Sequence, residues 1–264
     1  MLKASNDYYN LKYKTPNDIK NKFPNSKILV IGNGYSTGDL IKYKDKLKNY
    51  FDAVIGTNWA IRYFEKQMDV FLATEKQLGE MGLVKYINRK TDYKKNIMHF
   101  INYRAINQFR NDIDKYKITR YPFVPETRIQ DYMVGEGEGL IKGPATPHGL
   151  SAGTVMMQGI HLASIFGAKE IYLVGSELMF KHNKSDHYYK DDFYYTSGQD
   201  KKDPVVMVKW KGQNYKSTEF FSASAKFIDK LTREDCQQVG IKIFDFSDGL
   251  LEAPTRLKME DFFK

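Results

Sequence analysis

The segment from residue 185 to residue 192, SDHYYKDD, gathers side chains that can carry out acid–base chemistry. His187 can act as a general base, and the hydroxyl groups of Tyr188 and Tyr189 can donate hydrogen bonds to a departing phosphate. The same composition also fits an aromatic segment that packs on the rim of a sheet, and both interpretations stand. His182 lies five residues before His187, a spacing that does not place two metal ligands on one helix face.

A glycine-rich turn follows the first apolar run, within KILVIGNGYSTGDL at residues 27–40. Gly32 and Gly34 allow a tight turn and a close approach of a ligand to the backbone. Ser36 or Thr37 can cap the following helix, whose first N–H groups form an anion site. Thr37 stands where the dinucleotide fingerprint has its third glycine, and no G-K-[ST] follows, so neither nucleotide motif is present. The turn predicts either ligand contact of another kind or a purely structural turn.

Two further polar side chains come directly after apolar runs. Asn58, in GTNWAIRYF, has an amide that can bind a base or a ribose, or can cap a helix. Glu75, in FLATEKQ, has a carboxylate that can bind a sugar hydroxyl or a metal, or can remain solvated. Ligands of open α/β sheets bind beyond the carboxyl ends of the strands, which is where the pattern places both residues.

Short apolar runs alternate with helix-like stretches along most of the chain. Strands that alternate with helices are typical of an open, mainly parallel α/β sheet. The runs are apolar without alternation, which predicts strands covered by helices on both faces of the sheet. The predicted strands are 28–32, 52–56, 69–73, 96–101, 170–175 and 241–246, and the predicted helices are 38–50, 58–67, 103–116, 151–166 and 219–235.

The stretch SAGTVMMQGIHLASIF at residues 151–166 predicts a helix that Ser151 caps and Gly167 ends. Its glycines and alanines allow close packing on the sheet. His161 lies in the middle of the helix among apolar neighbours, which favours a packing role for this histidine over a catalytic one. The polar and aromatic residues 177–217 follow the carboxyl end of a predicted strand. A long segment in that place is typical of a lid or substrate-binding insertion. We therefore predict one domain over residues 1–264 with a lid-like insertion.

The composition sets limits on the partners. The 264 residues carry a formal charge of +9 and a pI of about 9.2, which suits an anionic partner or, equally, a solvated lysine-rich surface. The lysines are scattered and form no basic stripe, so we expect no nucleic-acid partner. The single cysteine, Cys236, indicates a reducing compartment, and no apolar run is long enough to span a membrane. These features predict a cytoplasmic protein and leave a peripheral membrane location open.

Taken together and in order, VIGNGYS, VIGTNWAI, MDVFLATE and LSAGTVMMQGIHLASIFGAKEIYLVGSEL resemble a group of nucleotide-dependent transferases. The group contains the MptE-like pterin diphosphokinases, the motility accessory factor (Maf) proteins and, more distantly, the bacterial sialyltransferases that use CMP-sialic acid. The match runs from about residue 26 to about residue 180, with a gap between about 100 and 145. The resemblance implies a Rossmann-like domain that binds a nucleotide through Gly32, Asn33, Gly34, Ser36, Asn58, Ser151, Ala152 and Gly153.

The resemblance also implies a mechanism, and the chain departs from it at specific positions. In the sialyltransferases a histidine is the base, tyrosines assist phosphate departure, and no metal is required. Here Tyr35 replaces the usual proline, Glu177 replaces the usual aspartate, and YKSTEFF has Lys216 but no histidine where the base would fall. His187, with Tyr188 and Tyr189, is our substitute hypothesis for the catalytic group.

Three functions stay open from the sequence. The favoured one is a metal-independent glycosyltransferase that moves a sugar from a cytidine nucleotide to a surface glycan or protein, with Glu75 and Glu177 contacting substrate. The second is an ATP- and Mg²⁺-dependent diphosphokinase of the 6-hydroxymethylpterin type, in which Glu75, Glu177 and the pair at 191–192 supply metal oxygens. The third is a non-catalytic nucleotide-binding module of the same fold.

Overall fold

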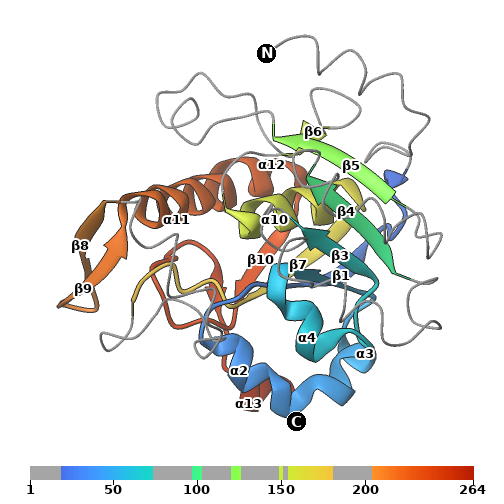
Figure 1. Ribbon diagram of the computed structural model, residues 1–264, viewed down its shortest axis with the longest axis horizontal. Helices are drawn as coiled ribbons and strands as arrows, with labels where there is room; N and C mark the ends of the chain where they lie inside the picture. Colours follow the sequence, from blue (N-terminus) through green and yellow to red (C-terminus); the bar gives the residue numbers. More distant parts are fainter. Residues whose placement is uncertain (1–18, 74–96, 103–119, 126–148, 151–153, 181–203) are drawn as a thin grey trace.

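In the computed structural model shown in Figure 1, a parallel sheet forms the centre of the protein. The structure describes residues 19–73, 97–102, 120–125, 149–150, 154–180 and 204–264. In these residues the sheet has nine strands in the order β11-β10-β7-β1-β2-β3-β4-β5-β6, and every pairing is parallel. The strands are β1 (Ser26–Ile31), β2 (Ala53–Thr57), β3 (Val70–Ala73), β4 (Met98–Asn102), β5 (Arg120–Pro125), β6 (Gly149–Leu150), β7 (Ala168–Val174), β10 (Lys242–Asp245) and β11 (Thr255–Arg256).

The central strands are apolar because both faces of the sheet are covered. In β1, Ile28 and Val30 pack in a cluster with α10 (Val155–Ile165) and α11 (Glu219–Leu231). Leu29 and Ile31 of the same strand point the other way, into a second cluster with the helices of the opposite face. Those helices are α2 (Ser36–Leu40), η2 (Ile41–Lys46), α3 (Leu47–Tyr50), η3 (Asn58–Ala60), α4 (Ile61–Phe64) and α13 (Met259–Phe262). The predicted Rossmann-like α/β architecture with helices on both faces is confirmed.

The helix α10 differs from its predicted form at its beginning and agrees at its end. Its cap is Thr154, whose Oγ1 accepts a hydrogen bond from the amide of Met157 at 3.4 Å; the predicted cap, Ser151, lies outside the described residues. Gly159 has to be small, because a Cβ there would lie 2.5 Å from Cγ1 of Val30. Gly167, at φ +89°, follows the helix in the left-handed conformation that ends it, as predicted.

The chain order places a switch point between β1 and β7. Strands β2 to β6 extend the sheet on one side of β1, and α10 then returns the chain so that β7 pairs with the other side. At such a point the connections from two neighbouring strands leave for opposite faces of the sheet. Crevices for ligands form there, beyond the carboxyl ends of the strands.

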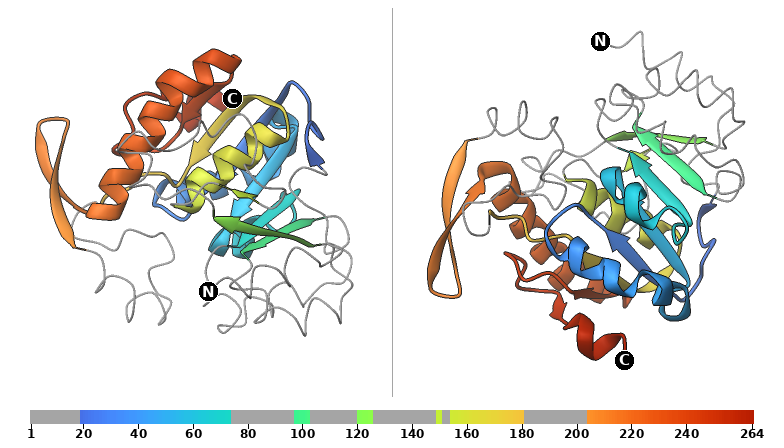
Figure 2. Two further views of the ribbon diagram at one scale, coloured as in Figure 1. Left: turned by 90° about the horizontal axis from the view of Figure 1, so that it is seen from above. Right: turned by 60° about the horizontal axis from the view of Figure 1, so that its bottom comes forward.

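A two-stranded hairpin extends from the body beside α11 (Figure 2). It consists of β8 (Val205–Trp210) and β9 (Gln213–Thr218), which pair antiparallel, and it lies in the predicted insertion at 177–217. After α11 the chain continues through η7 (Thr232–Cys236) and α12 (Gln237–Val239). Sequence analysis did not predict β5, β6, β11 or the hairpin, and the predicted helix 103–116 lies outside the described residues.

Candidate functional site

The glycine turn after β1 is joined to the segment after β7 through backbone contacts. The amide of Gly32 donates to the carbonyl of Val174 at 2.8 Å, and the amide of Gly34 donates to the carbonyl of Gly175 at 3.1 Å. A Cβ on Gly32 would lie 2.5 Å from the Gly175 carbonyl oxygen. Gly175 itself has φ +74°, a conformation that glycine adopts without strain. The two connections at the switch point therefore form one packed unit.

The second glycine of the turn accommodates a carboxylate of the protein itself. A Cβ on Gly34 would overlap Oε2 of Glu177, and the other oxygen, Oε1, accepts the amide of Ser36 at 2.7 Å. Glu177 is 2% exposed, and its Oε2 has no hydrogen-bond partner among the described residues. From the sequence, Glu177 is predicted to contact substrate. In the structure its carboxylate holds the turn through the amide of Ser36. The substrate contact stays a prediction.

The hydroxyl groups that follow the turn do not cap α2, contrary to the sequence expectation. The residue before the helix is Tyr35, which makes no side-chain cap. Oγ1 of Thr37 donates instead to the carbonyl of Gly32 at 3.0 Å. Oγ of Ser36 accepts the amide of Gly175 at 2.8 Å and lies 2.9 Å from Oγ of Ser247. The Thr37 hydroxyl thus closes the turn on itself, and the Ser36 hydroxyl holds it against the segments that follow β7 and β10.

Ser247 connects Ser36 to a buried ion pair. Its Oγ lies 2.9 Å from Oγ of Ser176 and accepts the Ser176 amide at 2.9 Å. Asp245, at the end of β10, accepts the Ser176 hydroxyl and the Ser247 amide on Oδ1, each at 2.8 Å. Its Oδ2 accepts a hydrogen bond from Nη1 of Arg256. A chain of hydrogen bonds thus runs from the arginine to the glycine turn.

The carboxyl group of Asp245 is fully buried, and burial raises its pKa from 3.8 to about 6. The Arg256 guanidinium and the hydrogen bonds from Ser247 and Ser176 act in the opposite direction, and nearby Glu177 raises the pKa further. Arg256 also donates Nη2 to the carbonyls of Gly249 and Leu251. At neutral pH the pair is charged, and the arginine side chain remains 35% exposed.

A small cavity of about 70 Å³ lies on the α10 side of the turn. Gly32, Asn33 and Gly34 line it together with the first residues of α10, Thr154 to Met156, and the side chains of Leu178 and Phe221. Asn33 is 6% exposed, and its Oδ1 has no hydrogen-bond partner among the described residues. The cavity therefore lies at a glycine turn and a helix N-terminus, and Asn33, whose buried amide oxygen has no partner among the described residues, is one of its lining residues.

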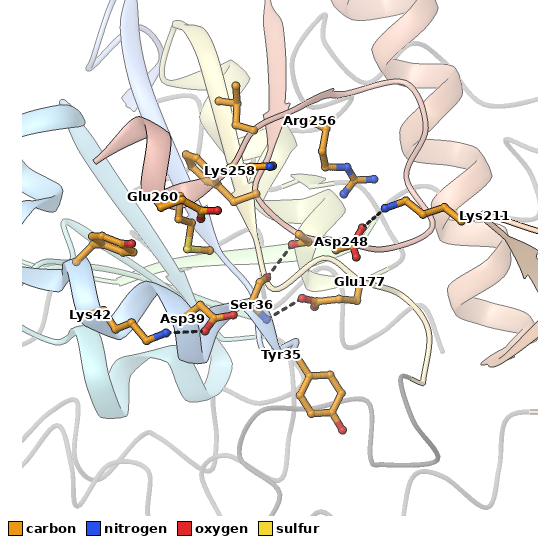
Figure 3. Close-up of a pocket in the computed structure, with 15 residues that line it drawn as sticks. Tyr35, Ser36, Asp39, Lys42, Glu177, Lys211, Asp248, Arg256, Lys258 and Glu260 are labelled. Carbon is orange, nitrogen blue, oxygen red and sulfur yellow. Dashed lines mark hydrogen bonds and ion pairs between the residues drawn. The ribbon is translucent and has the colours of Figure 1, made fainter. Parts of the chain in front are cut away.

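A larger cavity of about 530 Å³ lies on the other side of the turn (Figure 3). Its lining includes Ser36, Glu177 and Ser247 and alternates in charge around the rim. Lys42 pairs with Asp39 at 3.1 Å, and Lys211 pairs with Asp248 at 2.8 Å; both pairs are exposed. In Figure 3 the ring of Tyr35 points away from the other labelled side chains.

The structure brings some predicted nucleotide-binding residues together and separates others. Gly32, Asn33 and Gly34 share the small cavity with the beginning of α10, as the resemblance implies. Ser36 faces the larger cavity instead. Asn58 is 2% exposed and has φ +43°, and the cap position of its 3-10 helix is Thr57, so the alternative that Asn58 is the cap is wrong. A ligand contact of Asn58 stays a prediction.

Several predicted residues lie outside the described part of the chain. These are the catalytic candidates His187, Tyr188 and Tyr189, the substrate candidate Glu75, and the nucleotide candidates Ser151, Ala152 and Gly153. Their assignments stay predictions.

Sequence analysis missed Ser176, Asp245, Ser247 and Arg256. For Asp245 and Ser247 the available signal was FDFSDG at residues 244–249, where polar residues begin within the last predicted strand and continue past its end. Within the described residues, no group of three or more His, Cys, Asp or Glu side chains could hold a metal ion, and no helix could cross a membrane.

Comparison with known proteins identifies similar folds. No protein-family model matches the sequence, and no curated protein matches it. Among solved structures, the Maf glycosyltransferase from Magnetospirillum magneticum AMB-1 superimposes with a TM-score of 0.61 at 16% identity, over 93% of this chain and 35% of that chain. The Campylobacter jejuni sialyltransferase CstII in complex with CMP-3FNeuAc matches with a TM-score of 0.44 at 15% identity, over 87% of this chain and 86% of that chain.

These matches concern the fold. The chain spans about a third of the length of the Maf glycosyltransferase that it resembles. At 16% identity the likeness to the Maf glycosyltransferase supports the Rossmann-like architecture predicted from the sequence motifs.

Proposed function

We propose that the chain is a nucleotide-dependent glycosyltransferase whose donor binds on the α10 side of the glycine turn. The observation that carries the proposal is the meeting of the Gly32–Gly34 turn with the N-terminus of α10 at a cavity beside the switch point. The fold is shared with a Maf glycosyltransferase over 93% of this chain. Position, local chemistry and fold therefore favour the same class of reaction.

The N-terminus of α10 supplies the chemistry that a donor phosphate needs. A helix leaves its first amides without partners inside the helix, and its dipole favours negative charge there. Thr154 takes the amide of Met157, which leaves the amides of Val155 and Met156 for a ligand at the cavity that these residues line. A volume of about 70 Å³ accommodates a phosphate or a ribose and not a whole nucleotide, since ligand pockets usually measure about 300–1,000 Å³.

Asn33 gives the site a means of selecting its ligand. A buried amide oxygen without a partner is costly, and a ligand hydroxyl or amino group that donates to it removes that cost. A ribose hydroxyl has this chemistry. Because the sequence resembles a group that includes enzymes of CMP-sialic acid, cytidine nucleotides are the donors to test first, with a surface glycan or protein as acceptor. In this proposal His187 is the base, Tyr188 and Tyr189 assist phosphate departure, and no metal takes part.

Titration calorimetry with CMP, CDP, UDP and ATP, each with and without Mg²⁺, tests the donor class. We expect CMP and CDP to bind without metal. Asn33→Ala should weaken CMP binding about tenfold, the value of one hydrogen bond of about 1.4 kcal/mol. Asn49→Ala is the matched control, because Asn49 is an exposed asparagine on α3, and it should leave the affinity unchanged. Binding of ATP with Mg²⁺ and indifference to cytidine nucleotides would overturn the proposal in favour of the diphosphokinase.

Donor hydrolysis separates an enzyme from a binding module. With a cytidine nucleotide sugar, wild-type protein should release CMP, and His187→Ala should lower turnover about 100-fold, within the range of general base catalysis, with CMP affinity unchanged. His182→Ala is the matched control in the same segment. If the wild-type protein binds CMP but His187→Ala turns over at the wild-type rate, another residue is the base.

A further inference from the structure

We propose that Arg256 and Asp245 are positioning residues for the nucleotide turn, acting through Ser176, Ser247 and Ser36. This inference rests on the proposed function only in that the turn is taken to contact the nucleotide. The hydrogen-bond chain itself lies entirely within the described residues and is independent of any ligand.

The ionised carboxylate determines the direction of every hydroxyl in the chain. Ionised Asp245 can only accept, so the Ser176 hydroxyl donates to it. The Ser176 oxygen then accepts from the Ser247 hydroxyl, and the Ser247 oxygen accepts from the Ser36 hydroxyl and from the Ser176 amide. Each hydroxyl donates once, and no donor or acceptor conflicts with its neighbour.

The end of this chain is the feature that affects the turn. Because the Ser36 hydroxyl donates toward Ser247, its oxygen presents a lone pair to the amide of Gly175, which it accepts at 2.8 Å. The amide of Ser36 is held independently by Glu177. The side chain and the backbone of Ser36 are thus held by two different groups. Because the Gly32–Gly34 backbone is covalently joined to Ser36 through Tyr35, these contacts also restrain the turn.

Protonation of Asp245 would remove the constraint that fixes the direction of these serine hydrogen bonds. A protonated carboxyl can donate as well as accept, so the Ser176, Ser247 and Ser36 hydroxyls could turn around. The Ser36 oxygen would then accept from both Ser247 and Gly175, instead of donating to one and accepting from the other. The charged groups that face Asp245 are Arg256, which lies in β11, and Glu177, which follows β7; Arg256 favours the ionised form and Glu177 opposes it. Arg256 therefore keeps the turn in its ordered form at neutral pH.

The test follows the backbone amide signals of Gly34, Ser36 and Gly175 by NMR across pH 4.5 to 8 in the unliganded protein. In wild type these signals should shift together with a midpoint near pH 6, where Asp245 titrates. Arg256→Gln removes the stabilising cation and should raise the midpoint by about one pH unit or more. Arg256→Lys keeps the charge without the fork geometry and should fall between the two.

Ser247→Ala interrupts the chain without changing any charge. The amide of Gly175 should then exchange with solvent about fivefold faster, the expected effect of one weakened hydrogen bond. The matched control is Ser224→Ala, because Ser224 is also a buried serine but bonds only within α11, at 2.7 Å to the carbonyl of Phe220. In the Ser224→Ala variant, the amide of Gly175 should exchange at the wild-type rate.

If Arg256→Gln does not fold, the double variant Asp245→Asn/Arg256→Gln removes both charges of the pair, and the titration of the three amides near pH 6 should vanish. The proposal is overturned if that titration persists without Asp245, if the Arg256 variants keep the wild-type midpoint, or if Ser247→Ala behaves as Ser224→Ala does. CMP affinity, measured on the same variants, should fall with loss of turn order. Absence of CMP binding in wild type would overturn the proposed function and leave the amide results to decide the positioning role.

Discussion

The two sides of the glycine turn use the same residues in different ways. On the α10 side, the cavity of about 70 Å³ is lined by the backbone of Gly32 to Gly34 and by the N-terminus of a helix. On the opposite side, the cavity of about 530 Å³ is lined by charged side chains, and the side chains of Ser36 and Glu177 hold the turn from there. One side presents backbone to a ligand, and the other side fixes that backbone in place.

The difference changes the meaning of the Gly-x-Gly pattern. Gly32 is required by the carbonyl of Gly175, and Gly34 is required by the carboxylate of Glu177. Both glycines are therefore necessary for packing within the protein, with or without a ligand. Asn33 and the N-terminus of α10, which line the smaller cavity together with the turn, are the features that favour a ligand there.

The largest expected effect comes from forcing the two sides apart. Gly34→Ala places a methyl group on the Glu177 carboxylate and should cost about 3 kcal/mol of stability and abolish nucleotide binding. Urea unfolding and calorimetry measure the two effects. Glu177→Ala in the same chain should recover part of the stability by vacating the space, whereas Glu177→Gln, with the same volume, should recover none.

The control for this substitution is Gly212→Ala in the hairpin. A Cβ at Gly212 meets no atom within 4 Å, although its φ of +79° disfavours alanine. The cost there should be only the backbone strain of about 1–2 kcal/mol, with nucleotide binding unchanged. Equal costs at both glycines would contradict the steric explanation for Gly34.

The next effect is the pH dependence of folding stability, to which the buried groups Asp245 and His161 contribute with opposite sign. Burial raises the pKa of Asp245 from 3.8 to about 6, so the folded state holds its proton more tightly and stability falls as pH rises through that interval. Burial lowers the pKa of His161, in α10, from 6.5 to about 4, so stability rises as pH rises through that interval. Across its interval each group changes the free energy of unfolding by about 3 kcal/mol, and the two changes have opposite signs.

Chemical unfolding at pH 4 and pH 7 measures these slopes. The stability of Asp245→Asn relative to wild type should increase with pH, and the stability of His161→Gln relative to wild type should decrease with pH. The absolute cost of each substitution cancels from the slope. Parallel curves for wild type and either variant would exclude that group as the source of pH dependence.

A smaller effect compares two helix caps. Thr154 caps α10 beside the small cavity, and Thr218 caps α11, accepting the amide of Phe221 at 3.1 Å. Replacement of either threonine by alanine should cost about 1 kcal/mol of stability. Thr154→Ala should weaken CMP binding more than Thr218→Ala does, because it disorders the amides that face the cavity, whereas Thr218 only holds the amide of Phe221, one lining residue. Equal loss of affinity in both variants would place the nucleotide elsewhere.

Sequence patterns predict the central fold well, for a physical reason. Strands β1, β2, β3, β7 and β10 are apolar runs because they are covered on both faces, and a buried run is visible without knowledge of its neighbours. In contrast, β5 contains two prolines and β11 has two residues, so neither produces such a run.

The residues of the candidate site likewise fall into two groups, those that the local sequence predicts and those that depend on distant strands. The turn at Gly32 to Ser36 was predictable, because it depends on the strand directly before it. The partners of Ser36 lie 139 and 211 residues further along the chain, at Gly175 and Ser247. Asp245 is hidden in the run IKIFDF, where its pairing with Arg256 depends on the neighbouring strand β11. Contacts between distant strands cannot be deduced from local spacing.

The smallest expected effect concerns the rim of the larger cavity. Lys211 and Asp248 form an ion pair at 2.8 Å, but their side chains are 67% and 53% exposed. A double-mutant cycle of Lys211→Ala and Asp248→Ala should give a coupling energy of about 0.2–1 kcal/mol that decreases in high salt. The buried Asp245–Arg256 pair, in a parallel cycle, should give a larger coupling that salt hardly changes, because water is excluded from its carboxylate. Similar couplings for the two pairs would show that the buried pair does not hold the turn, since a positioning contact has to be stronger than a solvated one.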